Sequence, residues 1–201
     1  MALVSSRLKK KFENWVASNI EPLRSLGLTP NTLTLMGLLA SFTASYCYIS
    51  WKINALMLPT AGALVLISGL LDAVDGVLAR STGKVSAFGG FLDSVFDRYS
   101  DAVVLSALIL GGLCHPVWGL AAIVGSLMVS YARARAEASG IGMAAVGFAE
   151  RAERMLLLAI ATFAAVFNLE LLGWGVALLA VLAQLTVLQR VIHFYGEAKK
   201  I

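Results

Sequence analysis

The stretch from Leu70 to Asp101, LLDAVDGVLARSTGKVSAFGGFLDSVFDRYSD, places five aspartates inside a strongly apolar chain. Of the 201 residues in the whole sequence, 59% are hydrophobic and only 14% are charged. Soluble domains usually carry about 25% charged residues. The composition therefore predicts an integral membrane protein, in which charged side chains at membrane depth are costly and usually functional.

Apolar runs on both sides of this stretch define the expected architecture. A membrane-spanning helix needs about 20 apolar residues, or fewer where polar flanks reach the interface. Because the connections between runs are short, consecutive helices should be antiparallel neighbours. We expect an all-α integral membrane protein that forms one domain over residues 1–201, with a six-helix bundle at 33–193. The six predicted transmembrane helices are 33–51, 55–79, 87–113, 116–136, 155–169 and 171–191.

The positive side chains predict the orientation of this bundle. They gather before the first run, between the second and third, between the fourth and fifth, and after the sixth. Lys52 is the exception. Since cytoplasmic loops are enriched in Lys and Arg, both termini and the aspartate-rich stretch are expected on the cytoplasmic side of a cell membrane.

The N-terminal segment 1–28 has its own pattern. Its apolar residues recur at steps of three and four, and basic residues lie between them. This pattern predicts an amphipathic helix in the cytoplasmic interface, or alternatively a solvated helix packed on the bundle. The sequence GLTPNTLT, which follows, predicts a turn at Pro30 and a cap for the first span.

The aspartates fall into two pairs at helical spacing. Asp72 and Asp75 are three residues apart near the end of one helix, and Asp93 and Asp97 are four apart near the start of the next, so each pair shares a face. Because STGK reverses the chain between them, the four carboxylates can converge. Clustered carboxylates without His or Cys favour hard divalent ions, Mg²⁺, Mn²⁺ or Ca²⁺. Two pairs suggest two ions, which commonly clamp a phosphate or diphosphate.

Neighbouring residues support a ligand at this place. Gly76, Gly89 and Gly90 permit close approach of a substrate, or simply of another helix. Arg80 offers a fork for a phosphate oxygen, unless it only enforces topology. Asp101 is expected to support the site as a partner of Arg98, and is not expected to ligate a metal.

The spacing Asp-x-x-Asp-Gly-x-x-Ala-Arg, eight residues, Gly-x-x-x-Asp-x-x-x-Asp, from Asp72 to Asp97, resembles the complete signature of the CDP-alcohol phosphotransferase family. The resemblance implies a homodimer with a cytoplasmic-facing cavity, where a CDP-lipid reacts with an alcohol to give a phosphodiester and CMP. It implies that Asp72, Asp75, Asp93 and Asp97 hold two Mg²⁺ or Mn²⁺ ions and that Asp97 is also the general base. It places the CDP group near Asn31, Thr34, Asp72, Gly76 and Arg80.

Arginines in the second half of the chain indicate the acceptor. Clusters near a metal site suit an acceptor that already bears a phosphate, although these arginines could instead enforce topology and pair with Glu137, Glu150 and Glu153. The strings SYARARAEASG and GFAERAERMLL resemble the inositol 1-phosphate branch of the family, the phosphatidylinositol phosphate and archaetidylinositol phosphate synthases. The candidate phosphate contacts are Arg133, Arg135, Arg151, Arg154 and Arg190.

The expected function is therefore transfer from CDP-diacylglycerol or CDP-archaeol to inositol 1-phosphate, with membrane lipids but no nucleic acid as partners. Glycerol 3-phosphate is the alternative acceptor, because it is also a phosphomonoester. A divalent-cation channel or transporter is the alternative of another class. It would need polar residues along the outward half of the third run, where residues 103–113, VVLSALILGGL, show almost none.

Overall fold

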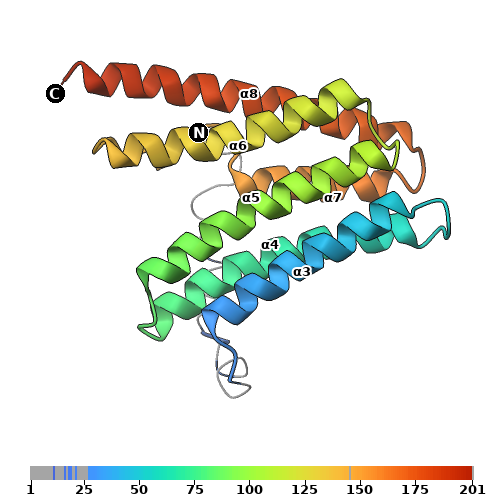
Figure 1. Cartoon of the computed structure of the whole chain (residues 1–201), viewed down its shortest axis with the longest axis horizontal. Coiled ribbons are helices and arrows are strands. Elements are labelled where there is room, and N and C mark those ends of the chain that lie inside the picture. The colour runs from blue at the N-terminus through green and yellow to red at the C-terminus, as the bar shows by residue number, and fades with distance from the viewer. Residues whose placement is uncertain are drawn as a thin grey trace.

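The computed structural model describes residues 27–144 and 146–200, together with Lys11, Val16, Ser18, Asn19 and Glu21. Within these residues the chain forms helices joined by loops and turns, and no strand occurs (Figure 1). The helices are α3 (Pro30–Ile49), α4 (Met57–Ser81), α5 (Ala87–Leu110), α6 (Pro116–Ala138), α7 (Arg151–Ala164) and α8 (Glu170–Ala198).

Local capping explains where several helices begin. Pro30 is the first residue of α3, and the Thr29 side chain accepts a 3.2 Å hydrogen bond from the Thr32 amide, which confirms the predicted cap. At the start of α5, the Ser86 side chain accepts a 3.0 Å hydrogen bond from the Gly89 amide. This cap fixes the beginning of the helix that carries Asp93 and Asp97.

Consecutive helices run antiparallel, so α3 and α5, and likewise α6 and α8, are parallel neighbours (Figure 1). α3 packs against α4 and α5, α6 packs against α8, and α7 contacts both α4 and α8. The loops after α3, α5 and α7 lie at one end of the molecule, whereas the α4–α5 connection and the C-terminus lie at the other (Figure 1). The alternation of short connections therefore produces the expected up-and-down order.

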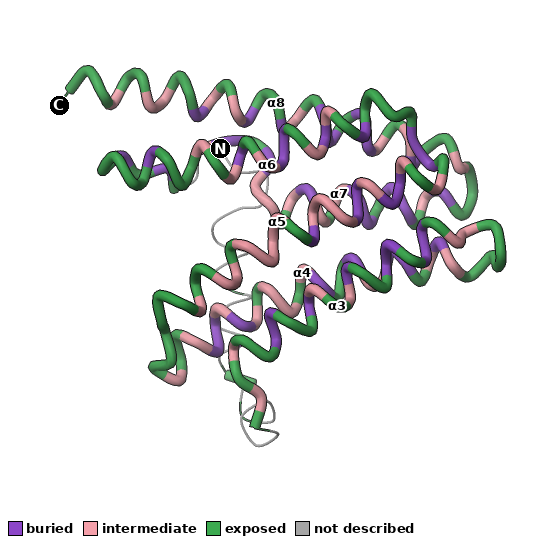
Figure 2. The backbone as a smooth tube through the Cα atoms, in the orientation of Figure 1, coloured by how far each residue is buried: buried purple, intermediate pink, exposed green. Residues whose placement is uncertain are grey.

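The core consists of small and medium apolar side chains between the helices, and polar contacts join distant elements inside it. The Tyr48 hydroxyl of α3 lies 2.6 Å from the Thr162 hydroxyl of α7. Outward-facing residues are often apolar too, including Leu39, Phe42 and Tyr46 on α3. Figure 2 shows buried residues where helices face one another and exposed residues on their outer sides. An apolar outer surface is what a lipid environment requires.

Four of the described helices are long and apolar enough to cross a membrane: α3, α4, α6 and α8. α5 carries Asp93, Asp97, Arg98 and Asp101, and α7 has only 14 residues. The helices match the six predicted runs in order, but α7 begins at Arg151 instead of residue 155. The first turn of α7 contains charged side chains, so the apolar pattern does not include it. α8 also continues beyond the predicted end at residue 191.

Most of the predicted interfacial helix at 1–28 lies outside the described residues. Val16 is described and is buried in a small cluster with Leu33 of α3 and with Val77 and Leu78 of α4. The segment thus contacts the bundle at this residue, close to the ends of α3 and α4 that border the aspartates.

Candidate active site

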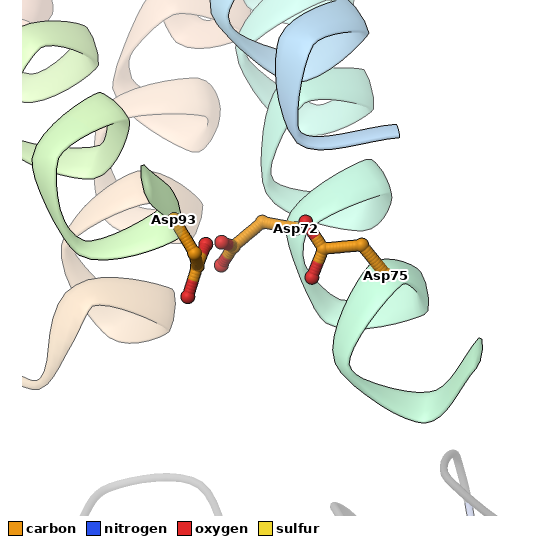
Figure 3. Close-up of side chains that lie close together, drawn as sticks. All are labelled: Asp72, Asp75 and Asp93. Carbon is orange, nitrogen blue, oxygen red and sulfur yellow. The ribbon is translucent and has the colours of Figure 1, made fainter. Parts of the chain in front are cut away.

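Three of the predicted metal ligands converge between α4 and α5. Asp72, Asp75 and Asp93 each offer a carboxylate oxygen, and these oxygens lie within 4.8 Å of one another. Figure 3 shows Asp72 and Asp75 projecting from α4 and Asp93 reaching toward them from α5. The three- and four-residue spacings and the reversal at residues 82–86 therefore bring the two helices' carboxylates together, as predicted.

Asp97 lies one helical turn from Asp93 and borders the same site through a different contact. Its Oδ1 atom is 2.9 Å from Arg151 Nη1, and the same nitrogen is 2.7 Å from Asp72 Oδ2. Asp97 and Asp72 thus hold one guanidinium between them. Arg98, the next residue, lies 3.5 Å from Asp97 Oδ2.

The residues present fit a hard divalent cation. The ligand set consists of carboxylates alone, which suits Mg²⁺ or Mn²⁺ better than a softer metal. The Oδ1 atom of Asp93 is buried and has no hydrogen-bond partner among the described residues. Because a buried carboxylate oxygen is unstable without a partner, an ion at this position would satisfy it.

A pocket of about 180 Å³ lies on the α3 side of the aspartates. Thr34 donates a 2.7 Å hydrogen bond to Asp75 Oδ2, so this buried hydroxyl fixes the carboxylate. Asn31 reaches the start of α5, because a Cβ atom on Gly89 would lie 3.2 Å from Asn31 Oδ1 and 3.0 Å from Ser86 Oγ. The absence of a side chain at Gly89 therefore lets these two elements approach closely.

Gly76 and Arg80 line the same pocket, one turn apart on α4. A Cβ atom on Gly76 would lie 3.3 Å from Arg80 Nη1, so the missing side chain leaves room for the guanidinium. Lys84 also lines this pocket. Its position between the second and third apolar runs predicts only a cytoplasmic positive charge, without a ligand contact.

A larger cavity of about 500 Å³, here called the central cavity, adjoins this pocket and shares Asp75, Gly76, Arg80 and Asp93 with it. Its lining joins the carboxylates to four of the five predicted arginines: Arg133 of α6, Arg151 and Arg154 of α7, and Arg190 of α8. Arg135 is exposed on α6 and does not line it. Glu150 and Ser130 also line it, although neither was predicted as a site residue.

The arginines of the central cavity are held in different ways. Arg133 forms an exposed 2.9 Å ion pair with Glu137, one turn along α6. Arg190 donates hydrogen bonds to the backbone carbonyls of Val129 and Val146, which fixes its guanidinium between α6 and the loop before α7. Because backbone carbonyls leave most of the positive charge uncompensated, Arg190 remains suited to an anion.

Asp101 contacts Arg151 and Arg154. The predicted partner was Arg98, so this prediction was wrong about the partner. Arg154, only 4% exposed, donates to Asp101 Oδ2 at 2.8 Å and to the Ala149 carbonyl at 3.1 Å. Arg151 Nε lies 3.5 Å from Asp101 Oδ1. The expected supporting role therefore has other partners, because Asp101 faces α7 whereas Arg98 turns back to Asp97 and the Ser94 carbonyl.

Comparison with known proteins agrees with this geometry. Residues 27–188 match the family model described as CDP-alcohol phosphatidyltransferase. The archaetidylinositol phosphate synthase of Pyrococcus horikoshii is 44% identical over 195 residues, covering 97% of this chain and 96% of that protein.

Two solved structures of the Mycobacterium tuberculosis phosphatidylinositol phosphate synthase are also similar, each at 30% identity. The complex with manganese and citrate gives a TM-score of 0.77 and covers 90% of this chain and 88% of that one. The structure with CDP-DAG bound gives 0.76 and covers 90% and 93%.

Proposed function

Because the chain belongs to the CDP-alcohol phosphatidyltransferase family, we propose that it transfers the phosphatidyl-type group of a CDP-activated lipid to inositol 1-phosphate and releases CMP. The observation that carries this proposal is the shared cavity, in which the aspartate cluster meets Arg133, Arg151 and Arg190. Relatives named as archaetidylinositol phosphate and phosphatidylinositol phosphate synthases support the choice of acceptor.

The proposed reaction is a displacement at phosphorus. An acceptor hydroxyl oxygen forms a bond to the lipid-side phosphorus, and the bond from that phosphorus to the bridging oxygen breaks. CMP leaves with the electron pair, and Asp97 accepts the proton of the hydroxyl as the general base. The proposed ligands of two Mg²⁺ or Mn²⁺ ions are Asp72, Asp75, Asp93 and Asp97. Such ions, when bound, neutralise the diphosphate and the charge that develops on the leaving CMP.

The pocket on the α3 side is the proposed site of the CDP group. Arg80 lines it and supplies a positive charge for a phosphate oxygen, while Gly76 leaves room beside that side chain. Thr34 holds the Asp75 carboxylate, and Asn31 closes the pocket against the start of α5. Asp75 and Asp93 line both this pocket and the central cavity, and Asp72 lines the central cavity next to them, within reach of the CDP group.

The central cavity is the proposed acceptor site. A phosphomonoester carries up to two negative charges, and Arg133 and Arg190 offer planar donors to its oxygens. Arg135, exposed near the end of α6, would act at the entrance. Arg154 has a different proposed role, because its donors already engage Asp101 and the Ala149 carbonyl. It would hold the cavity wall in place.

The membrane arrangement belongs to the same proposal. We infer that α5 and α7 also cross the bilayer, which gives six spans in one domain, because their polar residues face the cavity and not lipid. The ends that carry Arg80, Lys84, Arg133 and Arg151 would then be cytoplasmic, together with both termini. The protein would act in the cell membrane as a homodimer.

Acceptor and lipid can be tested together. CMP release by the purified protein in detergent with Mg²⁺ is compared for inositol 1-phosphate, free inositol, glycerol 3-phosphate and serine, each with CDP-diacylglycerol and CDP-archaeol. The proposal expects rapid release with inositol 1-phosphate alone. Preference for glycerol 3-phosphate would contradict the proposed acceptor and indicate a phosphatidylglycerophosphate synthase-like function. Inactivity with every acceptor and both lipids would contradict the transferase assignment.

A further inference from the structure

The Arg151 guanidinium contacts two of the four carboxylates proposed as metal ligands, Asp72 and Asp97. Its Nη1 atom lies 2.7 Å from Asp72 Oδ2 and 2.9 Å from Asp97 Oδ1, and its Nε atom lies 3.5 Å from Asp101 Oδ1. Two of these three partners are proposed metal ligands. A guanidinium and a divalent cation that use the same carboxylate oxygens compete for them.

The contacts of Arg151 are close but poorly directed. Among the described residues, neither Nε nor Nη1 has a hydrogen-bond partner with acceptable geometry. Arg154, one turn further along α7, instead donates directly to Asp101 and to the Ala149 carbonyl. Arg190 likewise donates to two backbone carbonyls. Arg151 is therefore held mainly by charge, and its long side chain can exchange one anion for another without breaking directed hydrogen bonds.

Arg151 is also placed where it could contact an anion bound in the central cavity. It is the first residue of α7, and it lines the central cavity with Arg133 and Arg190. Neighbouring guanidiniums repel one another, so they disfavour Arg151 in the cavity unless an anion is also present there. A phosphate in the cavity would reverse this balance.

We propose that Arg151 couples cation binding to acceptor binding: its guanidinium leaves Asp72 and Asp97 to a divalent cation and moves to the phosphate of the acceptor. The acceptor half of this inference rests on the proposed function, whereas the competition for the carboxylates does not. Because thermodynamic coupling is reciprocal, an anion in the central cavity then tightens cation binding, and the cation tightens anion binding.

The coupling is measured directly by titrating the purified full-length protein with Mn²⁺ in detergent micelles, without CDP-lipid, in the presence and absence of sulfate. Free Mn²⁺ is followed by electron paramagnetic resonance, which needs no catalytic activity. Sulfate is a tetrahedral dianion, so the test does not depend on which phosphomonoester is the substrate. The wild-type protein should bind Mn²⁺ about fivefold more tightly with sulfate than without it.

Arg151→Ala and Arg151→Gln remove the guanidinium that competes with Mn²⁺ for the carboxylates. Each variant should bind Mn²⁺ about tenfold more tightly than wild type when sulfate is absent, and sulfate should no longer change its affinity. Arg133→Ala is the matched control. It also removes one arginine from the central cavity, but the partner of Arg133 is the exposed Glu137 and not a proposed metal ligand. Without sulfate, its Mn²⁺ affinity should stay within about twofold of wild type.

Three results would overturn the inference. The first is an Mn²⁺ affinity in the Arg151 variants equal to or weaker than that of wild type. The second is sulfate coupling that survives in those variants. The third is a wild-type Mn²⁺ affinity that sulfate leaves unchanged, a result that decides the matter even if neither variant folds. A wild-type protein that binds no Mn²⁺ would contradict the metal site itself, independently of the acceptor's identity.

Discussion

Arg154 and Asp101 form an enclosed ion pair at the site, with Nη2 of the arginine 2.8 Å from Oδ2 of the aspartate and side-chain exposures of 4% and 12%. The pair joins α7 to α5 at the wall of the central cavity, which Arg154 lines. Because removal of one partner leaves the other charge buried, such pairs are sensitive to substitution.

Asp101→Asn should therefore destabilise the protein by about 3 kcal/mol, since Arg154 keeps its charge without a counter-ion. Denaturant-induced unfolding in detergent micelles measures this change. Glu137→Gln is the matched control, because the Arg133–Glu137 pair is 46% exposed on each side and its loss should cost less than about 1 kcal/mol. Equal stability of the two variants would show that the buried pair contributes no more than the exposed one.

Thr34→Val should weaken Mn²⁺ binding about tenfold, because Asp75 loses the hydrogen bond that fixes its carboxylate. Valine keeps the shape of the side chain, so the packing of α3 should be preserved. Thr34→Ser restores the hydroxyl and should recover most of the affinity. If the valine and serine variants bind Mn²⁺ equally well, the Thr34 hydroxyl does not position Asp75 for the cation.

Gly89→Ala should raise the KM for CDP-lipid, because the new Cβ atom lies 3.0 Å from Ser86 Oγ and 3.2 Å from Asn31 Oδ1. Crowding of this kind commonly costs about 1–3 kcal/mol and would push Asn31 away from the pocket. Initial rates against CDP-lipid concentration give the KM. Gly196→Ala on α8, where nothing lies within 4 Å of the new atom, should behave as wild type. An unchanged KM in the Gly89 variant would mean that Asn31 does not border the bound nucleotide.

Asp97→Asn should reduce CMP release at least about a hundredfold, because asparagine cannot accept the proton of the attacking hydroxyl. The variant should remain folded and should still bind CDP-lipid, as size-exclusion chromatography and a direct binding assay would show. Turnover at the wild-type rate would remove Asp97 from the proposed mechanism.

Arg133→Ala should raise the KM for inositol 1-phosphate about tenfold and leave the affinity for CDP-lipid unchanged. Lys199→Ala removes a positive charge from the end of α8, away from the cavity lining, and should change neither quantity. If the KM for inositol 1-phosphate is unchanged in the Arg133 variant, Arg133 does not bind the acceptor and serves only to orient the protein in the membrane.

The aspartates could be predicted from the sequence because their positions depend on short-range rules. A spacing of three or four residues sets a common helix face, and a short connection sets the neighbouring helix. These rules brought Asp72, Asp75 and Asp93 together. The apolar pattern gave the wrong start for α7, because it begins four residues after the helix begins at Arg151.

The arginines could not be distinguished by spacing, because their partners come from other elements. In the sequence Arg151 and Arg154 look alike, yet Arg154 hydrogen bonds to Asp101 while Arg151 reaches Asp72 and Asp97. Asp101 is 53 residues from Arg154 along the chain. Only the packing of α7 beside α4 and α5 decides which guanidinium is fixed and which can exchange.

The measurement that tests the central claim most directly is identification of the products formed from CDP-archaeol, or CDP-diacylglycerol, and inositol 1-phosphate with Mg²⁺. Mass spectrometry of the lipid fraction and quantification of CMP are made on the same reaction, with Asp97→Asn as the inactive control. The account predicts equal amounts of CMP and of a lipid that retains both the transferred phosphate and the phosphate of the acceptor. CMP formed without that lipid, or at the same rate in the Asp97 variant, would contradict it.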